Sequence, residues 1–471
     1  METLSVQPKK SSKVDEKQLL DFKSAIRGQL ITQQDDSYDE ERTVYNGMID
    51  RYPDYIVKCR DVADVIHSVN FARDNNLLTA VRSGGHNAGG LGVVDKGIVI
   101  DLSLMRGTRV DLKNNTVRAE GGCLLGDIDH ATQAFNKAIP TGILSTTGIS
   151  GLTLGGGLGH LSRAYGLAID NIIEADVVLA NGKLVTASEK ENADLFWAIR
   201  GGGGNFGIVT SFLFRLSDAG TVYGGPMLWH IEDGEEMMRF YRDFILKAPN
   251  SIYCYFALLT VPPVPIFPQE LHLKKMCGVV WCNVGDLEKS KKAVDQFRDF
   301  KKPALDYTGP IAFNALQSLF DGLYPKGLQW YWKADFVKDL TETAIRLNIN
   351  YGMKLPTTHS TMHLYPINGA CHKVGKKDTA FRYRDANWAQ VIVGIDPEPG
   401  NREKISRWAK EYWEAMHPHS AGGAYINFMM EEGQERVKAS YGDNYEKLAK
   451  IKAKYDPQNF FRVNQNVVPA K

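Results

Sequence analysis

The segment Arg82-Ser83-Gly84-Gly85-His86-Asn87 follows a strand-like run at residues 78–82 and begins an irregular loop. Its two adjacent glycines allow the backbone to approach a ligand more closely than a side chain would permit. A single histidine in a loop is more often a hydrogen-bonded polar residue than a functional one, so His86 gains a role only from its surroundings. The other glycine-rich segments of the chain supply those surroundings.

A second glycine-rich segment spans residues 140–160, with glycines at positions 142, 148, 151, 155, 156, 157 and 159. Small hydroxyl residues, Thr147 and Ser150 among them, lie between these glycines. Such a segment can be a plain linker, or it can offer many backbone N–H and hydroxyl donors to phosphate groups. The density of donors without bulky side chains favours phosphate binding.

A third run, Gly202-Gly203-Gly204-Asn205-Phe206-Gly207, satisfies the dinucleotide-binding pattern G-x-G-x-x-G. That pattern indicates a Rossmann site only when a strand precedes it and a helix follows it. Here the order is reversed, because residues 194–200 are helix-like and residues 208–216 are strand-like. A nicotinamide site is therefore disfavoured, and the serine-hydrolase pattern G-x-S-x-G is absent from the sequence as well.

Taken in order, these segments resemble the cofactor domain of the vanillyl-alcohol-oxidase and berberine-bridge family of flavoproteins. The resemblance rests on residues 82–87, 140–142, 151–159, 165–171 and 196–210, and it resumes at residues 425–427 and 464–466. It covers nearly all of the chain from residue 46 onward, less strictly in the middle. It implies an α+β fold, with a two-part FAD-binding domain of the PCMH type and a substrate domain whose antiparallel sheet is covered by helices.

The resemblance also implies FAD as the cofactor, joined at its 8α carbon to a ring nitrogen of His86. Residues 82–87 and 148–157 would wrap the pyrophosphate, and Ile208 and Val209 would meet the adenine side. Asn427 and Asn464 would lie near the flavin. The complete set of residues that the resemblance places at FAD, besides His86, is Arg82, Ser83, Gly84, Gly85, Asn87, Thr147, Gly148, Gly151, Leu152, Gly155, Gly156, Gly157, Gly207, Ile208, Val209, Asn427, Asn464 and Asn466.

Two positions depart from the family pattern. Leu144 stands where relatives with a doubly attached flavin have a cysteine, so we expect a single covalent link. Phe428 stands where many relatives have a tyrosine, which some of them use as a base. Tyr425 is therefore the first candidate for the group that handles the substrate's proton, with a packing tyrosine as the alternative.

Further polar residues fall in the middle of the chain. His363, Tyr365, Asn368 and His372 lie in a polar and aromatic segment, residues 363–373, that we interpret as a strand lining the substrate pocket. For any one of these residues packing is the favoured interpretation, since a strand alternates its side chains between two faces and must direct some inward.

The chain divides into four expected parts: a tail and helix at 1–45, an FAD-binding domain at 46–217, a substrate domain at 218–420, and a berberine-like segment at 421–471 that returns to the FAD domain. A helix at residues 60–75 is predicted by apolar residues at the i, i+3, i+4, i+7 spacing, with Asp61 as its cap. Strands are expected at 252–260 and 275–283, and helices at 287–300 and 431–454.

The charge of the chain is nearly balanced, with 56 Lys and Arg against 55 Asp and Glu. Such a chain lacks the electrostatic footprint of a nucleic-acid binder, so a small molecule is the expected partner. No run of about 18 apolar residues is present, and no membrane association is expected. Residues 1–18 lack the apolar core of a signal peptide, and we interpret them as a disordered tail of a cytoplasmic protein. The six cysteines show no metal-binding spacing, so buried thiols and no metal are expected.

FAD supplies redox chemistry, while the protein orients the substrate and handles its proton. We expect an oxidase that takes a hydride from a C–H bond beside an alcohol or amine group of a sugar, a secondary metabolite or an alkaloid-like compound. The electrons would then pass to O2, giving H2O2. Two alternatives stay open: a dehydrogenase with another electron acceptor, and a non-catalytic flavin- or ligand-binding protein. The sequence names neither the substrate nor the oligomeric state.

Overall fold

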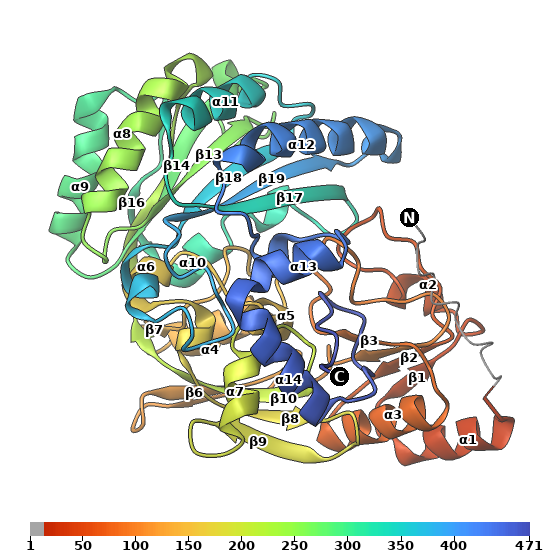
Figure 1. Cartoon of the computed structure of the whole chain (residues 1–471). Helices are drawn as coiled ribbons and strands as arrows, with labels where there is room; N and C mark the ends of the chain where they lie inside the picture. The colour runs from red at the N-terminus through yellow and green to blue at the C-terminus, as the bar shows by residue number, and fades with distance from the viewer. Residues whose placement is uncertain (1–13) are drawn as a thin grey trace.

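The computed structural model describes residues 14–471, and Figure 1 shows how its helices and sheets are arranged. The tail expected at the start of the chain falls mostly on residues 1–13, which lie outside the described residues. Helix α1 (Glu16–Ala25) begins directly after Asp15. The predicted helix is therefore confirmed, and the last three residues assigned to the tail are helical instead.

The first sheet carries the His86 loop at the end of one of its strands. Its strand order is β1 (Gln29–Ile31), β2 (Tyr55–Lys58), β4 (Ile98–Asp101) and β3 (Thr79–Arg82), with β2, β4 and β3 parallel. Helix α3 (Val62–Asp74) connects β2 to β3, and the Asp61 side chain accepts hydrogen bonds from the backbone N–H groups of Ala63 and Asp64. The predicted helix and its cap are confirmed.

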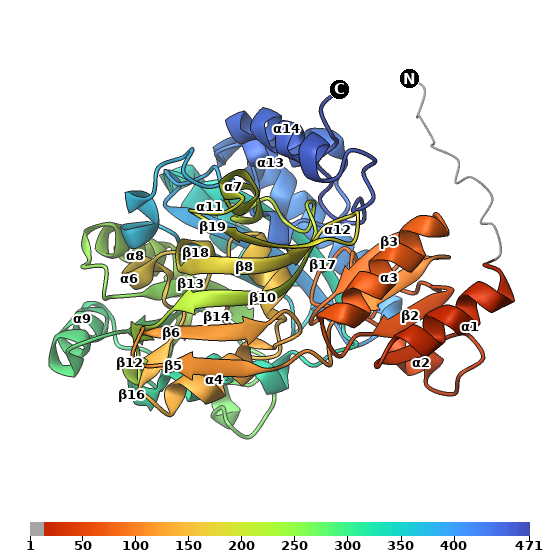
Figure 2. The same ribbon diagram turned by 90° about the horizontal axis from the view of Figure 1, so that it is seen from below.

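The second sheet is antiparallel and lies beside the first (Figure 2). Its strand order is β5 (Thr108–Asp111), β6 (Thr116–Glu120), β10 (Ile208–Arg215), β8 (Ile172–Val178) and β9 (Leu184–Ser188). Helices α4 (Leu125–Gln133) and α5 (Ile149–Leu154) follow β6 along the chain. Helix α7 (Ala193–Ile199) precedes the glycine run and β10 follows it, so the order that excludes a Rossmann site is confirmed.

The third sheet is also antiparallel and is covered by helices on one face (Figure 1). Its main strands, in spatial order, are β12 (Thr221–His230), β14 (Lys275–Asn283), β13 (Cys254–Thr260), β18 (Thr361–Pro366), β19 (Trp388–Asp396) and β17 (Gln329–Val337). The covering helices are α8 (Gly234–Lys247), α9 (Leu287–Phe300), α11 (Glu342–Gly352) and α12 (Arg402–Met416). The α+β prediction is confirmed.

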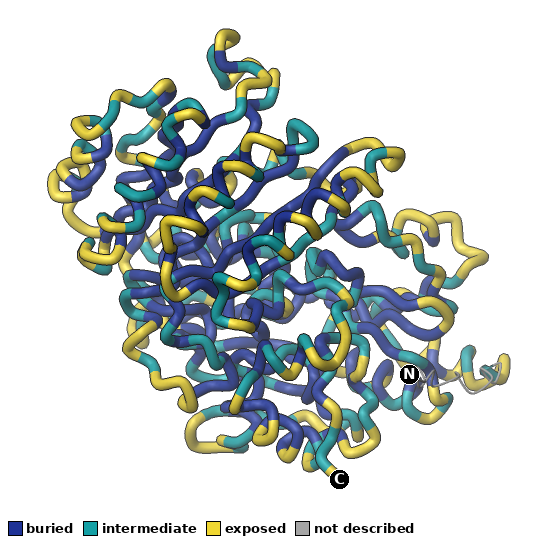
Figure 3. Tube along the Cα trace, turned by 45° about the horizontal axis from the view of Figure 1, so that its top comes forward, coloured by how far each residue is buried: buried dark blue, intermediate teal, exposed yellow. Residues whose placement is uncertain are grey.

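Smaller elements complete the chain. They are α2 (Tyr38–Glu41), β7 (Lys137–Ala138), α6 (Ser162–Tyr165), β11 (Ser217–Asp218), β15 (Leu305–Asp306), β16 (Gly309–Ala312) and α10 (Phe313–Gln317). Two of them, β15 and β16, pair with β12 of the third sheet. Figure 3 shows that buried chain runs through the middle of the molecule, while the exposed residues lie on loops and on the outer faces of the helices.

Alternation along the strands gives the third sheet two different faces. On β13, Phe256 and Leu258 pack in the core beneath the covering helices. The intervening Tyr255 and Ala257 belong to the core shared with the first half of the chain. Because side chains alternate along a strand, the uncovered face of this sheet is presented to the His86 loop and its neighbours.

Two expected elements end differently in the structure. The single helix expected at 431–454 is two helices, α13 (Gln434–Tyr441) and α14 (Tyr445–Tyr455), and Gly442 between them has a left-handed φ of 51° that a continuing helix does not adopt. The strand expected at 363–373 stops at Pro366, which has no N–H for a ladder, and a 3₁₀ turn follows at Gly369–Lys373.

The chain beyond α14 is held in place by a buried lysine. The Lys452 ammonium group donates to the Asp456 carboxylate at 2.5 Å and to the carbonyl groups of Asn205 and Phe461 at 2.6 and 2.9 Å. The Asn205 side chain in turn donates to the carbonyl of Gln465 at 3.1 Å. These bonds hold residues 456–465 against the glycine run 201–207.

Candidate active site

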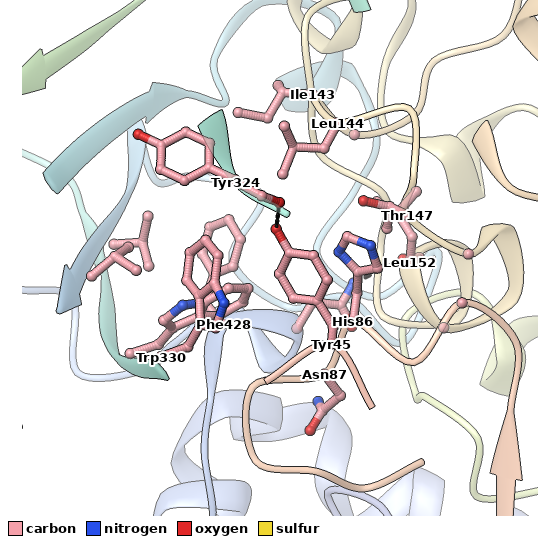
Figure 4. A pocket seen from close by; sticks show the side chains of 18 of the residues that line it. Tyr45, His86, Asn87, Ile143, Leu144, Thr147, Leu152, Tyr324, Trp330 and Phe428 are labelled. Atoms are coloured by element: carbon pink, nitrogen blue, oxygen red, sulfur yellow. Dashed lines mark hydrogen bonds between the residues drawn. The ribbon is translucent and has the colours of Figure 1, made fainter. Parts of the chain in front are cut away.

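A large cavity of about 380 Å³ lies between the His86 side of the molecule and the uncovered face of the third sheet. Its walls come from the His86 loop, residues 142–154, the glycine run 203–209, and the C-terminal segments 425–428 and 461–465. The opposite wall consists of residues from β12, β13, β14, β17, β18 and β19. Segments far apart in the sequence therefore meet at one site (Figure 4).

His86 lies on the cavity wall with its ring stacked on Tyr45, at a centroid distance of 3.8 Å (Figure 4). Tyr45 is held in turn, because its hydroxyl donates to the carbonyl of Tyr324 at 2.5 Å. Burial lowers the pKa of His86 to about 4, although a hydrogen bond to the backbone of Thr146 opposes this. His86 is therefore neutral near pH 7, with one nitrogen bonded to the protein and the lone pair of the other available to a cofactor.

The glycine segments form a wall that a ligand can approach closely. A Cβ on Gly148 would lie 2.1 Å from the amide nitrogen of Gly84, so these two loops touch through their backbones. A Cβ on Gly151 or Gly204 would meet no protein atom within 4 Å, although both residues line the cavity. Five more of the predicted FAD contacts also lie on this wall: Thr147, Leu152, Gly207, Ile208 and Val209.

Arg82 supports the His86 loop from behind with its charge already paired. Its guanidinium donates to the Asp101 carboxylate at 2.6 Å and to the carbonyl of Glu41 at 2.7 Å. Its stem packs beneath Gly85, and both charged partners are buried. Arg82 lines the cavity and the protein itself satisfies its charge, so its predicted contact with FAD stays a prediction.

Other polar side chains of the loop also serve the protein. The Ser83 hydroxyl donates to the carbonyl of Gly121 at 2.8 Å, and the Asn87 side chain accepts from the backbone N–H of Leu91 at 3.3 Å. Ser83, Gly84, Gly85 and Asn87 all remain on the cavity wall. The loop thus offers a ligand its backbone and the ring of His86 rather than charged side chains.

The C-terminal segments bring two of the three predicted asparagines to the cavity. The Asn427 side chain donates to the carbonyl of Leu152 at 2.8 Å, and that of Asn464 donates to the carbonyl of Gly204 at 3.1 Å. The Asn464 side-chain oxygen is buried without a protein partner, so it can accept a hydrogen bond from a ligand. Asn466 lies outside the cavity lining, and its carbonyl accepts from Gln434.

Tyr425 holds the backbone of the glycine segment. Its hydroxyl oxygen accepts from the N–H groups of Gly157 and Leu158 at 2.8 and 3.3 Å and from the Asn427 side chain at 2.8 Å. Burial raises the pKa of Tyr425 to about 12. A neutral hydroxyl whose oxygen already faces three donors is a poor proton acceptor near pH 7, so the geometry favours the packing alternative for Tyr425.

The glycines at 155–157 lie behind the wall rather than on it. A Cβ on Gly155 would lie 2.1 Å from the Asn427 side chain, and a Cβ on Gly157 would lie 2.2 Å from the Cβ of Ala168. Gly156 and Gly157 have positive φ of 138° and 76°. These residues let the segment turn and pack. The sequence analysis placed them at FAD, but they are not part of the cavity lining.

The opposite wall of the cavity is aromatic and uncharged. Its side chains on and near the third sheet include Tyr255, Tyr324, Trp330, Trp332, His363, Tyr365, Val391, Val393 and Phe428. Among the described residues that line the whole cavity, none is Asp, Glu or Lys, and Arg82 is paired. This wall therefore presents rings, aliphatic groups and a few neutral polar atoms.

Of the four polar residues predicted on the 363–373 segment, two reach the cavity. His363 and Tyr365 line it. Asn368 instead accepts from the buried Arg163 guanidinium at 2.7 Å, and His372 is bonded to the carbonyl of Ala386 at 2.8 Å. The strand ends before Asn368, so the last two side chains no longer follow its alternation.

Sequence reasoning missed the aromatic residues that surround His86. Tyr45, Tyr324 and Trp330 come from separate loops and a strand, and they meet only in the folded chain. Trp330 and Trp332 lie two positions apart on β17 and therefore share one face of the strand. This spacing is the sequence signal that could have identified them as neighbours on the cavity wall.

The cysteines lie away from the cavity. All six are buried and free, and none belongs to the cavity lining in residues 14–471. Leu144, which stands where relatives with a doubly attached flavin have a cysteine, lines the cavity (Figure 4).

Comparisons with known proteins agree with this architecture. Residues 53–188 match the family described as FAD binding domain, and residues 424–468 match the family described as berberine and berberine like. An FAD-linked oxidoreductase of Dictyostelium discoideum is 31% identical over 423 residues, which are 88% of this chain and 89% of that protein. The chain belongs to the vanillyl-alcohol-oxidase and berberine-bridge family.

Solved structures of the family have the same fold. The 6-hydroxy-D-nicotine oxidase of Arthrobacter nicotinovorans gives a TM-score of 0.85 at 27% identity, covering 94% of this chain and 98% of that one. The BBE-like 1 protein of Physcomitrella patens gives a TM-score of 0.85 at 24% identity, covering 96% and 99%. The predicted family and fold are thus confirmed, and this family member is an FAD-dependent oxidoreductase.

The cavity fits the cofactor of the family. Gly151 and Gly204 leave open space, the Asn464 side-chain oxygen is unpaired, and His86 presents a neutral ring to the same cavity.

Among the helices of residues 14–471, none has the length and apolar character that spanning a bilayer requires.

Proposed function

We propose that this family member is an oxidase that holds FAD through a single covalent bond to His86 and oxidises a neutral, largely apolar alcohol. The observation that carries the substrate class is the uncharged aromatic wall opposite His86. Oxidation removes a hydride from the carbon that bears the hydroxyl and a proton from its oxygen, and the electrons pass on to O2. Bound FAD supplies the hydride acceptor in this chemistry.

The single bond to the flavin is supported by three features of the site. His86 is neutral and lies on the cavity wall, its ring is held by Tyr45, and Leu144 replaces the cysteine that a second bond would need. The family likeness supplies the 8α position of the bond. Gly148, Gly151 and the 203–209 run would hold the phosphates and adenine through their backbones.

The substrate class is supported by what lines the cavity. Transfer of an ammonium or carboxylate group to a buried site is costly unless an opposite charge is present, and the described lining offers no unpaired charge. Rings such as Trp330 and Phe428 favour a flat or cyclic apolar skeleton instead. An alcohol fits this wall better than a protonated amine or a polar sugar does.

Matched alcohols and amines test this assignment. On anaerobic mixing of the holoprotein with substrate, we expect benzyl-type or alicyclic alcohols to bleach the flavin absorbance at least about tenfold faster than the matching amines, because a buried unpaired ammonium group costs several kcal/mol. Air should then restore the colour with release of H2O2. Faster bleaching by amines or sugars would contradict the substrate class. Recovery of the colour only when another electron acceptor is added would indicate a dehydrogenase.

The cytoplasmic location of the protein stays a prediction.

A further inference from the structure

A histidine and a tyrosine lie side by side on the cavity wall formed by β18. Met362 and Leu364 of this strand pack beneath the covering helices, so the intervening His363 and Tyr365 both face the cavity. His363 Nδ1 and the Tyr365 hydroxyl oxygen are 2.6 Å apart, a short hydrogen bond for these atoms. The two rings meet edge to face at 85°.

The pair lies where the substrate wall meets the segment that borders the cofactor residues. The Tyr365 ring is 5.9 Å from that of Phe428, which in turn is 4.8 Å from that of Tyr425. Tyr425 is bonded to the backbone of Gly157. A substrate held in the cavity beside His86 can thus bring its hydroxyl to Tyr365.

We propose that Tyr365 accepts the proton of the substrate hydroxyl while its own proton moves to Nδ1 of His363. This inference rests on the alcohol oxidation proposed above. It gives the site a proton acceptor on the third sheet. Relatives that use a tyrosine as a base have that tyrosine at the position of Phe428, which is far from Tyr365 in the sequence.

The step balances in atoms and electrons. The O–H and C–H bonds of the alcohol break and the second bond of a carbonyl group forms. The hydride leaves with both electrons of the C–H bond to bound FAD. The proton goes to the Tyr365 oxygen, and the Tyr365 proton goes to Nδ1, so Tyr365 stays neutral and His363 becomes an imidazolium. Tyr365 is the catalytic residue, and His363 acts through it.

Burial keeps both groups of the pair neutral before the reaction, and the negative charge that the hydride carries into the cavity offsets the imidazolium that the transfer forms. Burial lowers the pKa of His363 to about 3 and raises that of Tyr365 well above its ordinary value. The titratable groups that act on Tyr365, besides His363, are Tyr253, Tyr255 and Tyr324, all neutral near pH 7. A neutral imidazole can accept the tyrosine proton, which leaves the lone pairs of the tyrosine oxygen for the substrate hydroxyl.

The first test is the rate of anaerobic flavin bleaching by an alcohol that reduces the wild-type holoprotein. Tyr365→Phe should slow this rate by about 10²- to 10⁴-fold, the usual contribution of a positioned acid or base. His363→Asn should slow it as well and make it rise between about pH 6 and pH 9, because hydroxide then replaces the lost acceptor. Tyr253→Phe is the matched control, since its buried hydroxyl has no partner and lies outside the cavity lining.

A second test does not depend on turnover. In the holoprotein with bound benzaldehyde, labelled with ¹³C at its carbonyl carbon, the tautomer of His363 with its proton on Nδ1 should donate to the Tyr365 oxygen. The Tyr365 hydroxyl is then free to donate to the carbonyl group and should lower its infrared stretching frequency. The shift should vanish in Tyr365→Phe and persist in Tyr253→Phe. Equal rates and equal carbonyl frequencies in wild type and Tyr365→Phe would contradict the proton transfer through Tyr365 and His363, but not the proposed oxidase function. A wild type that no alcohol reduces would overturn the proposed function, and the pair with it.

Discussion

Gly151→Leu is expected to give a folded protein that binds FAD more weakly than the wild type does. Gly151 lies within helix α5 on the cavity wall, and a Cβ there would touch no protein atom within 4 Å. A helix interior ordinarily disfavours glycine by about 1 kcal/mol relative to alanine, so the protein itself gains nothing from glycine here. We infer that FAD occupies the space, and a leucine side chain would take it.

The expected effect is a loss of affinity for FAD without a loss of fold. Overpacking of this kind costs about 1–3 kcal/mol, which is about a 5- to 150-fold weaker complex. The measurement is the ratio of flavin to protein absorbance after reconstitution at a low FAD concentration in a His86→Ala background, where no covalent bond holds the flavin. The urea midpoint of the apoprotein is the check on folding. Gly400→Leu is the control, because Gly400 also has open space around it but lies far from the cavity lining. A Gly151→Leu protein with full flavin content would contradict this assignment of the cavity.

Lys452→Met is expected to produce the largest loss of stability. Lys452 and Asp456 are 0% and 1% exposed, and they are 2.5 Å apart. Removal of one partner from a buried ion pair typically costs about 3–5 kcal/mol, because the other charge stays buried without compensation. The carbonyl groups of Asn205 and Phe461 would lose a donor at the same time.

The same change should also weaken the hold on FAD. Lys452 holds the return segment that carries Asn464 to the cavity, so a loosened segment would withdraw the unpaired Asn464 oxygen from the ligand. Denaturation in urea measures the stability, and flavin content measures the second effect. Lys450→Met, on the exposed side of the same helix, should change neither. An unchanged midpoint for Lys452→Met would show that the buried pair is dispensable.

Much of the fold followed from local features of the sequence. The spacing of Val62, Val65, Ile66 and Val69 and the cap Asp61 identified α3, and the reversed order around the 202–207 run excluded a Rossmann site. The break at Gly442 was missed, although a glycine within a charged helical segment is a local signal for it.

The site was less predictable, because its contacts depend on the folded chain. Arg82 was predicted as an FAD contact, but the sequence did not show that its charge is paired with Asp101 on the neighbouring strand β4. Tyr425 resembled a base, but three donors converge on its oxygen. The stacking of Tyr45 on His86 joins residues that no periodic pattern connects. His363 and Tyr365 were predictable as a pair, since they lie two positions apart on one strand and therefore on the same face.

The central claim is the bond between His86 and FAD, and a visible spectrum of acid-precipitated protein tests it most directly. Acid unfolds the protein and releases a flavin that is only bound, whereas a covalently attached flavin stays with the polypeptide. We expect a yellow pellet from the wild type, and a colourless pellet with yellow supernatant from His86→Ala. A colourless wild-type pellet, or a yellow one from His86→Ala, would contradict the account.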